Sequence, residues 1–213
     1  GVGSATALDV SGLAHHGVVV GMPPTASWST GQFGGAASWG SGAGTGAIRI
    51  ERSAALDRMS VGFTMTAWVR LDAMPAGATL SIAARALPDT SLVSFGVGVR
   101  DGHGVLKWHC RSGQGGEQLA SNSFKVGAWT FVAVTVDAIE ARMYVNQLLM
   151  VRSPIGALPL AVGEAPLWIG NGVDGPSSPF MGRIDELAIW DVVLSPYQVE
   201  QIRTRARTPF DYP

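Results

Sequence analysis

The sequence predicts an all-β fold, a sandwich or barrel of short antiparallel strands. Its 28 glycines and 12 prolines are spread along the chain of 213 residues rather than gathered in one linker. They stand in turn-forming clusters such as "DAMPAG", "RDGHG" and "NGVDGPSSP", and short runs rich in β-branched and aromatic residues lie between these clusters. Many short strands separated by such turns are typical of sandwiches and barrels. We expect one domain over residues 1–213.

The clearest strands have an alternating or continuously apolar pattern. They are expected at residues 64–71, 92–100, 105–110, 129–136, 141–151, 166–169 and 183–191. The strand at 129–136 is apolar on both faces, which places it in the middle of a sheet. The run at 141–151 predicts a hairpin that turns near Asn146 and Gln147.

One helix is expected, in the stretch "LSPYQVEQIRTRAR" near the C-terminus. Ser195 can cap its first turn, and Pro196 suits the first helical position. Val199 and Ile202 lie on one stripe of this helix, so that stripe can pack on the strands. We expect a short closing helix rather than an organising element.

Composition and charge exclude several classes of function. The formal net charge is -1, so the chain has no basic field and is not expected to bind nucleic acid. No apolar run approaches the roughly 20 residues that a membrane-spanning helix needs, and we expect no membrane insertion. The single cysteine, Cys110, cannot form an internal disulfide and excludes a cysteine-based zinc site.

Several stretches of the chain follow the motifs of one family of sandwich domains. The strongest is "PLWIGNGVDGPSSPFMGRIDELAIWDVVLSPYQVEQI" at 166–202, and "FTMTAWVRLD" at 63–72 and "WTFVAVTVDAIEARMYVNQ" at 129–147 agree with it. The opening "LDVSGLAHHGVVVG" at 8–21 also fits, in the same order. In these motifs the chain resembles the laminin G-like, concanavalin A-like domains over nearly its whole length. The resemblance implies an antiparallel jelly-roll sandwich of two sheets with a short C-terminal helix.

The last expected strand carries two adjacent carboxylates, Asp185 and Glu186, in an otherwise core-forming pattern. A carboxylate in a half-buried strand is costly unless it is paired, hydrogen-bonded or bound to a cation. Strand alternation points Glu186 away from Asp185, toward solvent or toward Arg183 or Arg203. Asp185 is therefore the residue that needs a partner.

The resemblance implies one such partner, a structural calcium ion between the first and last strands, which lie side by side in such jelly rolls. Ca²⁺ prefers six to eight oxygen ligands from carboxylates and backbone carbonyls. The resemblance assigns these ligands to Asp9, Gly12, His16 and Asp185. An alternative without a metal stays open, in which Asp185 accepts N–H groups of the opening loop and meets Arg49 or Arg52.

The chain carries no recognisable catalytic motif. Glycoside hydrolases need two carboxylates on either side of the scissile bond, about 5.5 Å apart in retaining enzymes and about 6.5–9.5 Å apart in inverting ones. Outside "IDE", carboxylates such as Asp57, Asp72 and Asp137 are isolated and mostly lie at turn edges. There is also no nucleophile elbow and no P-loop. We expect a protein that is not an enzyme, with a glycoside hydrolase relative as the less favoured alternative.

Recognition is the function class that remains. Sugar sites combine an aromatic platform with amides, carboxylates and other hydrogen-bonding groups. The candidates in expected loops are Trp28, Trp39, Asp101, His103, Gln114, Glu117, Asn171 and Asp174. The tryptophans in expected strands are assigned to packing, and these are Trp68, Trp129, Trp168 and Trp190.

Two functions of different class are consistent with this sequence. One is a carbohydrate-binding, lectin-like adhesion module that presents its loops to a glycan. The other is a protein-interaction or spacer domain with no sugar site. Fold alone does not separate them. In both cases the resemblance implies an extracellular or cell-surface location, within a larger multidomain protein.

Overall fold

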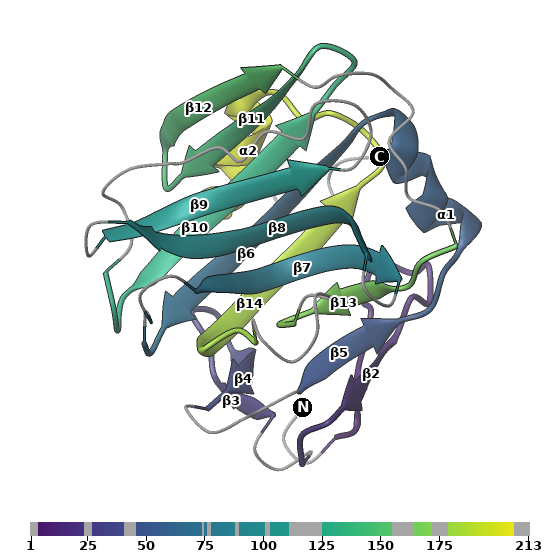
Figure 1. Ribbon diagram of the computed structural model, residues 1–213, viewed down its shortest axis with the longest axis vertical. Helices are drawn as coiled ribbons and strands as arrows, with labels where there is room; N and C mark the ends of the chain where they lie inside the picture. Colours follow the sequence, from purple (N-terminus) through teal and green to yellow (C-terminus); the bar gives the residue numbers. More distant parts are fainter. Residues whose placement is uncertain are drawn as a thin grey trace.

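The computed structural model describes residues 4–23, 27–40, 46–73, 75, 78–87, 90–100, 103–110, 125–154, 164–171 and 179–206. Within these residues two antiparallel sheets of seven strands each lie face to face (Figure 1). The expected all-β, two-sheet antiparallel sandwich is therefore confirmed. Two short α-helices, α1 (Ala54–Asp57) and α2 (Pro196–Arg203), and a 3₁₀ turn, η2 (Arg58–Val61), complete the described elements.

Each sheet combines strands from distant parts of the chain. Sheet A consists, in spatial order, of β1 (Thr6–Ala7), β2 (Gly17–Val20), β5 (Ala47–Ile50), β13 (Leu167–Ile169), β7 (Thr79–Leu87), β8 (Thr90–Arg100) and β9 (His103–Cys110). Sheet B consists of β12 (Leu148–Pro154), β11 (Glu140–Val145), β10 (Trp129–Val136), β6 (Phe63–Leu71), β14 (Gly182–Trp190), β4 (Gly35–Trp39) and β3 (Trp28–Thr30). The strand expected at 129–136 is β10, and it lies inside sheet B as predicted.

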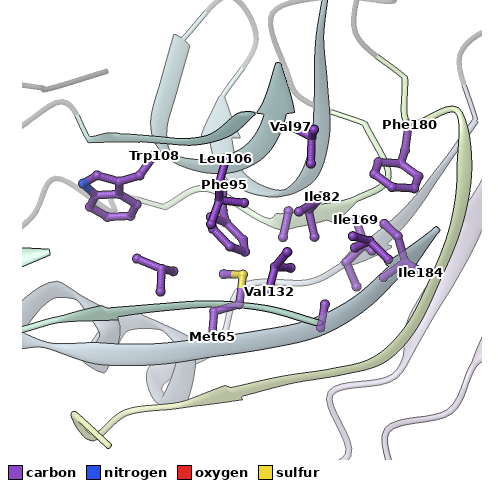
Figure 2. Close-up of a cluster of buried hydrophobic side chains, with 14 of the residues drawn as sticks. Met65, Ile82, Phe95, Val97, Leu106, Trp108, Val132, Ile169, Phe180 and Ile184 are labelled. Atoms are coloured by element: carbon purple, nitrogen blue, oxygen red, sulfur yellow. The ribbon is translucent and has the colours of Figure 1, made fainter. Parts of the chain in front are cut away.

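The main core lies between the two sheets, where alternate side chains of each strand point inward. Figure 2 shows Met65 and Val132 of sheet B facing Phe95, Leu106 and other side chains of sheet A. Burying a side chain of this size contributes about 1.5–3 kcal/mol. The core holds the two sheets together, and it leaves one face of each sheet on the outside.

The outer face of sheet B carries a second hydrophobic cluster, which α2 covers in part. Val199 and Ile202 of α2 are buried in this cluster together with Phe131, Tyr144 and Trp190 of the sheet. The helix begins with a capping box, since the Ser195 hydroxyl accepts the N–H of Gln198 and the Gln198 side chain accepts the N–H of Ser195. The expected C-terminal helix is thereby confirmed.

The structure differs from the sequence prediction at the N-terminal strands and at β7. The first and last strands were expected to be neighbours, and this expectation is wrong. β1 pairs with β2 at the edge of sheet A, whereas β14 lies between β6 and β4 in sheet B. Strand β7 was not predicted, because bulges between Ser81 and Ala83 and between Arg85 and Ala86 interrupt its alternation.

Candidate functional site

Asp185 lies at a bulge in β14. The pairing of β14 with β6 shifts between Asp185 and Ala188, and Glu186 takes the left-handed conformation with φ 49°. The N–H of Phe33 donates to Oδ2 of Asp185 at 2.8 Å, and the N–H of Glu186 donates to Oδ1 at 2.8 Å. The residue is only 6% exposed, and this burial raises the pKa of its carboxyl although the N–H groups lower it. The carboxylate therefore joins β14 to the loop between β3 and β4.

The bulge also determines the partner of Glu186. Its carboxylate lies 3.8 Å from the guanidinium of Arg205, not beside Arg183 or Arg203 as alternation suggested. Burial raises the pKa of Glu186, and the charge of Arg205 partly offsets this rise. The Arg205 guanidinium lies 4.4 Å from the centroid of the Phe33 ring. The segment after α2 is thus fastened to the same loop that binds Asp185.

Asp9 has a separate set of partners, in the loop after β1. Its carboxylate accepts the N–H and the hydroxyl of Ser11 and the N–H of His15, each at 2.8 Å. Its own N–H donates to Nδ1 of His16 at 3.0 Å. Partial burial raises the pKa of Asp9, but these hydrogen bonds from Ser11 and His15 hold it below its usual value. The opening loop is therefore closed on itself.

The geometry does not fit a calcium ion held by Asp9 and Asp185 together. Asp9 lies in the loop after β1 of sheet A and Asp185 lies in β14 of sheet B, and N–H or O–H donors point at the oxygens of both carboxylates. Gly12 and His16 lie in the loop of Asp9. No three His, Cys, Asp or Glu side chains come together in the part of the chain that the structure describes. Asp185 accepts N–H groups from the β3–β4 loop and from Glu186, rather than from the opening loop, and calcium binding stays a prediction.

The structure places the predicted platform residues as follows. Trp39 lies in β4 with 0% exposure, its Nε1 donates to the carbonyl of Gly46, and it cannot stack on a ligand, so that prediction is wrong. Trp28 is half-buried and its Nε1 donates to the carbonyl of Ser4 at 2.8 Å. Asn171 is buried just after β13. The remaining predicted side chains lie outside the described part: Asp101, His103, Gln114, Glu117 and Asp174.

A row of polar and aromatic residues that the sequence did not reveal crosses four strands of sheet B. Ser38 of β4 pairs with Arg183 of β14, Arg183 pairs with Arg70 of β6, and Arg70 pairs with Trp129 of β10. We call these four residues the arginine row. Their neighbours along the strands, such as Val69 and Ile184, point into the core, so the row lies on the outer face.

The arginine row is accessible beyond the part of the sheet that α2 covers. All four residues are half-buried, and the Arg70 side chain is 33% exposed. Trp129, expected to pack in the core, stands outside both hydrophobic clusters of the described residues. Its neighbour in the next row, Trp68, packs as expected, with Phe33 and Phe131 at its edges, centroids 5.8 and 5.5 Å away.

The two guanidinium groups of the row have few acceptors. Arg70 forms an ion pair with Asp72, whose Oδ1 lies 3.7 Å from Nε. Arg183 donates through one terminal nitrogen to the carbonyl of Thr30 at 3.4 Å. The Nε atoms of both arginines are buried without a hydrogen-bond partner. Alternation in "AWVRL" places Arg70 on the outer face, but the pairing with Arg183 depends on long-range register.

The fold is a jelly-roll sandwich of the concanavalin A-like type. The chain belongs to the concanavalin A-like lectin/glucanase superfamily, because the Laminin_G_3 model of that superfamily matches residues 41–200. A comparison with curated protein sequences found no match. The helices that the structure describes are too short to span a bilayer.

Solved structures of low sequence identity share the fold. Domain 4 of AbnA, a GH43 extracellular arabinanase from Geobacillus stearothermophilus in complex with arabinotriose, has a TM-score of 0.62 at 20% identity, with 83% of this chain and 80% of that one covered. The binding domain of Paraclostridial Mosquitocidal Protein 1 has a TM-score of 0.71 at 15% identity, with 97% and 51% covered. Trypanosoma rangeli sialidase in complex with sialic acid has a TM-score of 0.67 at 13% identity, with 95% and 31% covered. The chain thus spans about half of the second protein and a third of the third.

Proposed function

We propose that the protein is a non-catalytic, lectin-like module that binds a saccharide at the arginine row. The observation that carries this proposal is the half-buried Trp129 on the outer face, which lies in one cross-strand row with two guanidinium groups and a hydroxyl. A sugar ring can stack its C–H face on an indole while its hydroxyls bond to adjacent donors and acceptors. Trp129, Arg70, Arg183 and Ser38 together offer this combination.

The comparisons support the class of ligand. The similar arabinanase domain was solved with a bound oligosaccharide, arabinotriose, and the similar sialidase with sialic acid. An extracellular location and a place in a larger protein are part of the same proposal, since the arabinanase is extracellular and its matching part is one domain of it.

A binding role without catalysis agrees with the acids near the row. Hydrolysis of a glycosidic bond needs a general acid and a second carboxylate facing each other across the ligand. Asp185 is held by backbone N–H groups and Glu186 is turned toward Arg205, so neither faces a partner carboxylate across the row. We therefore expect that purified protein retains polysaccharides without cleaving them.

The experiment is a saccharide screen by affinity electrophoresis with wild type and the Trp129→Ala variant. We expect at least one saccharide to retard the wild type, and Trp129→Ala to weaken that binding about tenfold, which is about 1.4 kcal/mol. Tyr197→Ala is the matched control, because it removes an aromatic ring that is 70% exposed on α2, away from the row. Binding unaffected by Trp129→Ala would contradict the site. A screen without any binding would contradict the function and favour a protein-interaction domain.

Calcium does not enter the proposed site. The row consists of two cations, a hydroxyl and an indole, and such a set holds no divalent cation. We expect the saccharide to bind equally in calcium and in EDTA. Loss of binding in EDTA would instead revive the predicted calcium ion as part of the function.

A further inference from the structure

We propose that the arginine row binds an anionic group of the saccharide, the carboxylate of an acidic sugar or a sulfate ester. This inference rests on the proposed function and specifies the ligand class of that site. Its starting point is the direct cross-strand pairing of Arg70 with Arg183 on the outer face of sheet B. Like charges directly opposite each other destabilise a sheet. An anion between the two guanidinium groups would remove this repulsion.

The hydrogen bonding of the two arginines leaves capacity for such an anion. Each Nε is buried without a partner, and an unsatisfied buried donor costs about 1–3 kcal/mol. A guanidinium presents its donors as a planar fork that matches carboxylate and other oxyanions. A ligand on the outer face would meet the terminal nitrogens rather than the buried Nε atoms, and among the described residues only one of these, on Arg183, donates a hydrogen bond. The two adjacent forks are therefore suited to one shared anion.

The carboxylates near the row neutralise the pair only in part. Asp72 forms an ion pair with Arg70, its Oδ1 3.7 Å from Nε, but its side chain is 37% exposed, so solvent screens this contact. Both oxygens of Asp185 accept backbone N–H groups. Glu186 faces Arg205, whose positive charge it offsets. Arg183 has no carboxylate partner among the described residues, so its positive charge, next to the partly screened charge of Arg70, is available to a ligand.

The presence of Trp129 beside the arginines favours an acidic saccharide over a free anion as the ligand. It is the next residue of the row after Arg70, on the adjacent strand β10. Neighbouring residues across an antiparallel pair have Cβ atoms about 4.5–5.5 Å apart, close to the width of a sugar ring. A ring stacked on the indole would therefore place a carboxylate or sulfate substituent at the arginines.

The test compares matched pairs of charged and neutral polymers by affinity electrophoresis and calorimetry. Polygalacturonate is compared with its methyl ester, and dextran sulfate with dextran, at two salt concentrations. The variants are Arg70→Gln, Arg183→Gln and Arg70→Lys, which keeps the charge but loses the fork. Arg152→Gln is the matched control, because Arg152 is 62% exposed on β12, at the far edge of the same sheet.

We expect the wild type to bind at least one charged polymer about tenfold more tightly than its neutral counterpart, a difference of about 1.4 kcal/mol. Which of the two charged polymers binds separates carboxylate from sulfate. Arg70→Gln and Arg183→Gln should each lower the affinity for the charged polymer about tenfold, and the affinity of Arg70→Lys should be intermediate. The affinity of Arg152→Gln should stay within about twofold of wild type. The melting temperatures of the two Gln variants should not fall, because each removes a like-charge contact.

Three results would overturn the inference. Equal binding of charged and neutral polymers would show that the row does not select an anion. An equal loss of affinity in Arg152→Gln would show non-specific attraction to the whole surface. A fall in the melting temperature of Arg70→Gln or Arg183→Gln without a change in affinity would show that the arginines only stabilise the sheet. If charged and neutral polymers bind equally and Trp129→Ala weakens that binding, the anion inference fails and the proposed function stands. If no polymer binds in either experiment, both fail.

Discussion

The buried carboxylate of Asp185 is satisfied by backbone hydrogen bonds. Two adjacent acids in a strand would normally point to opposite faces. The bulge and the left-handed φ of Glu186 instead turn the backbone N–H of Glu186 toward the carboxylate of Asp185. The loop residue Phe33 supplies the second donor. The two carboxylates thus hold the β3–β4 loop and the segment after α2 on the same face.

The Asp185→Asn variant tests this role. Its amide keeps one acceptor but presents NH₂ to a backbone N–H, so a buried donor loses its acceptor. We expect a loss of about 1–3 kcal/mol in the free energy of unfolding, measured by urea at pH 7. The loss should be the same in calcium and in EDTA. A clearly larger loss in calcium would show that a metal binds Asp185.

The same variant has a defined pH dependence. The folded-state pKa of Asp185 is raised by burial, so the folded protein holds its proton more tightly than the unfolded chain does. The contribution of this carboxyl to stability is then fully present below the unfolded pKa, about 3.9, and is lost as the pH rises through the raised folded value. Wild type should therefore exceed Asp185→Asn in free energy of unfolding by less and less as the pH rises through that window. A difference that grows with pH would contradict the assignment.

At the scale of elements, close backbone approach fixes where β13 meets β4. Gly170 follows β13 with φ 77°, its N–H donates to Ile82, and its carbonyl accepts the N–H of Phe180. A Cβ added to Gly170 would overlap the indole of Trp39, which fills the core. Gly170 therefore brings the end of β13, in sheet A, against Trp39 of sheet B.

Gly170→Ala and Gly34→Ala form a matched pair that separates space from conformation. Both glycines have φ 77°, but nothing lies within 4 Å of a Cβ added to Gly34. Gly34→Ala should cost only the left-handed penalty of about 1–2 kcal/mol. Gly170→Ala should cost about 1–3 kcal/mol more, because the indole must move. Equal losses in thermal unfolding would show that Trp39 does not limit this position.

At the scale of the whole molecule, local signals predicted the elements better than their arrangement. The strand at 129–136 and the helix capped by Ser195 have patterns that a few neighbouring residues determine, and both appear as predicted. Trp39 is expected in a loop from the sequence, yet long-range pairing of β4 with β14 makes it part of the core. The residues near Trp39 in the sequence do not predict which strand β4 pairs with.

The candidate site illustrates the same limit. Arg70, Arg183 and Trp129 are separated by long stretches of sequence, and only the register of β6, β10 and β14 brings them into one row. The sequence-based search favoured loop residues, since loops often carry function. Alternation alone could have placed Arg70 and Trp129 on outer faces, but not beside each other.

A nuclear magnetic resonance titration with a saccharide that binds in the screen tests the proposed site most directly. We expect the indole N–H signal of Trp129 and the Nε–H signals of Arg70 and Arg183 to shift on binding. The indole signal of Trp39, hydrogen-bonded to Gly46 in the core, should stay in place. Shifts confined to Trp168 and Arg49, which lie together in sheet A, would contradict it and move the binding site to the opposite sheet.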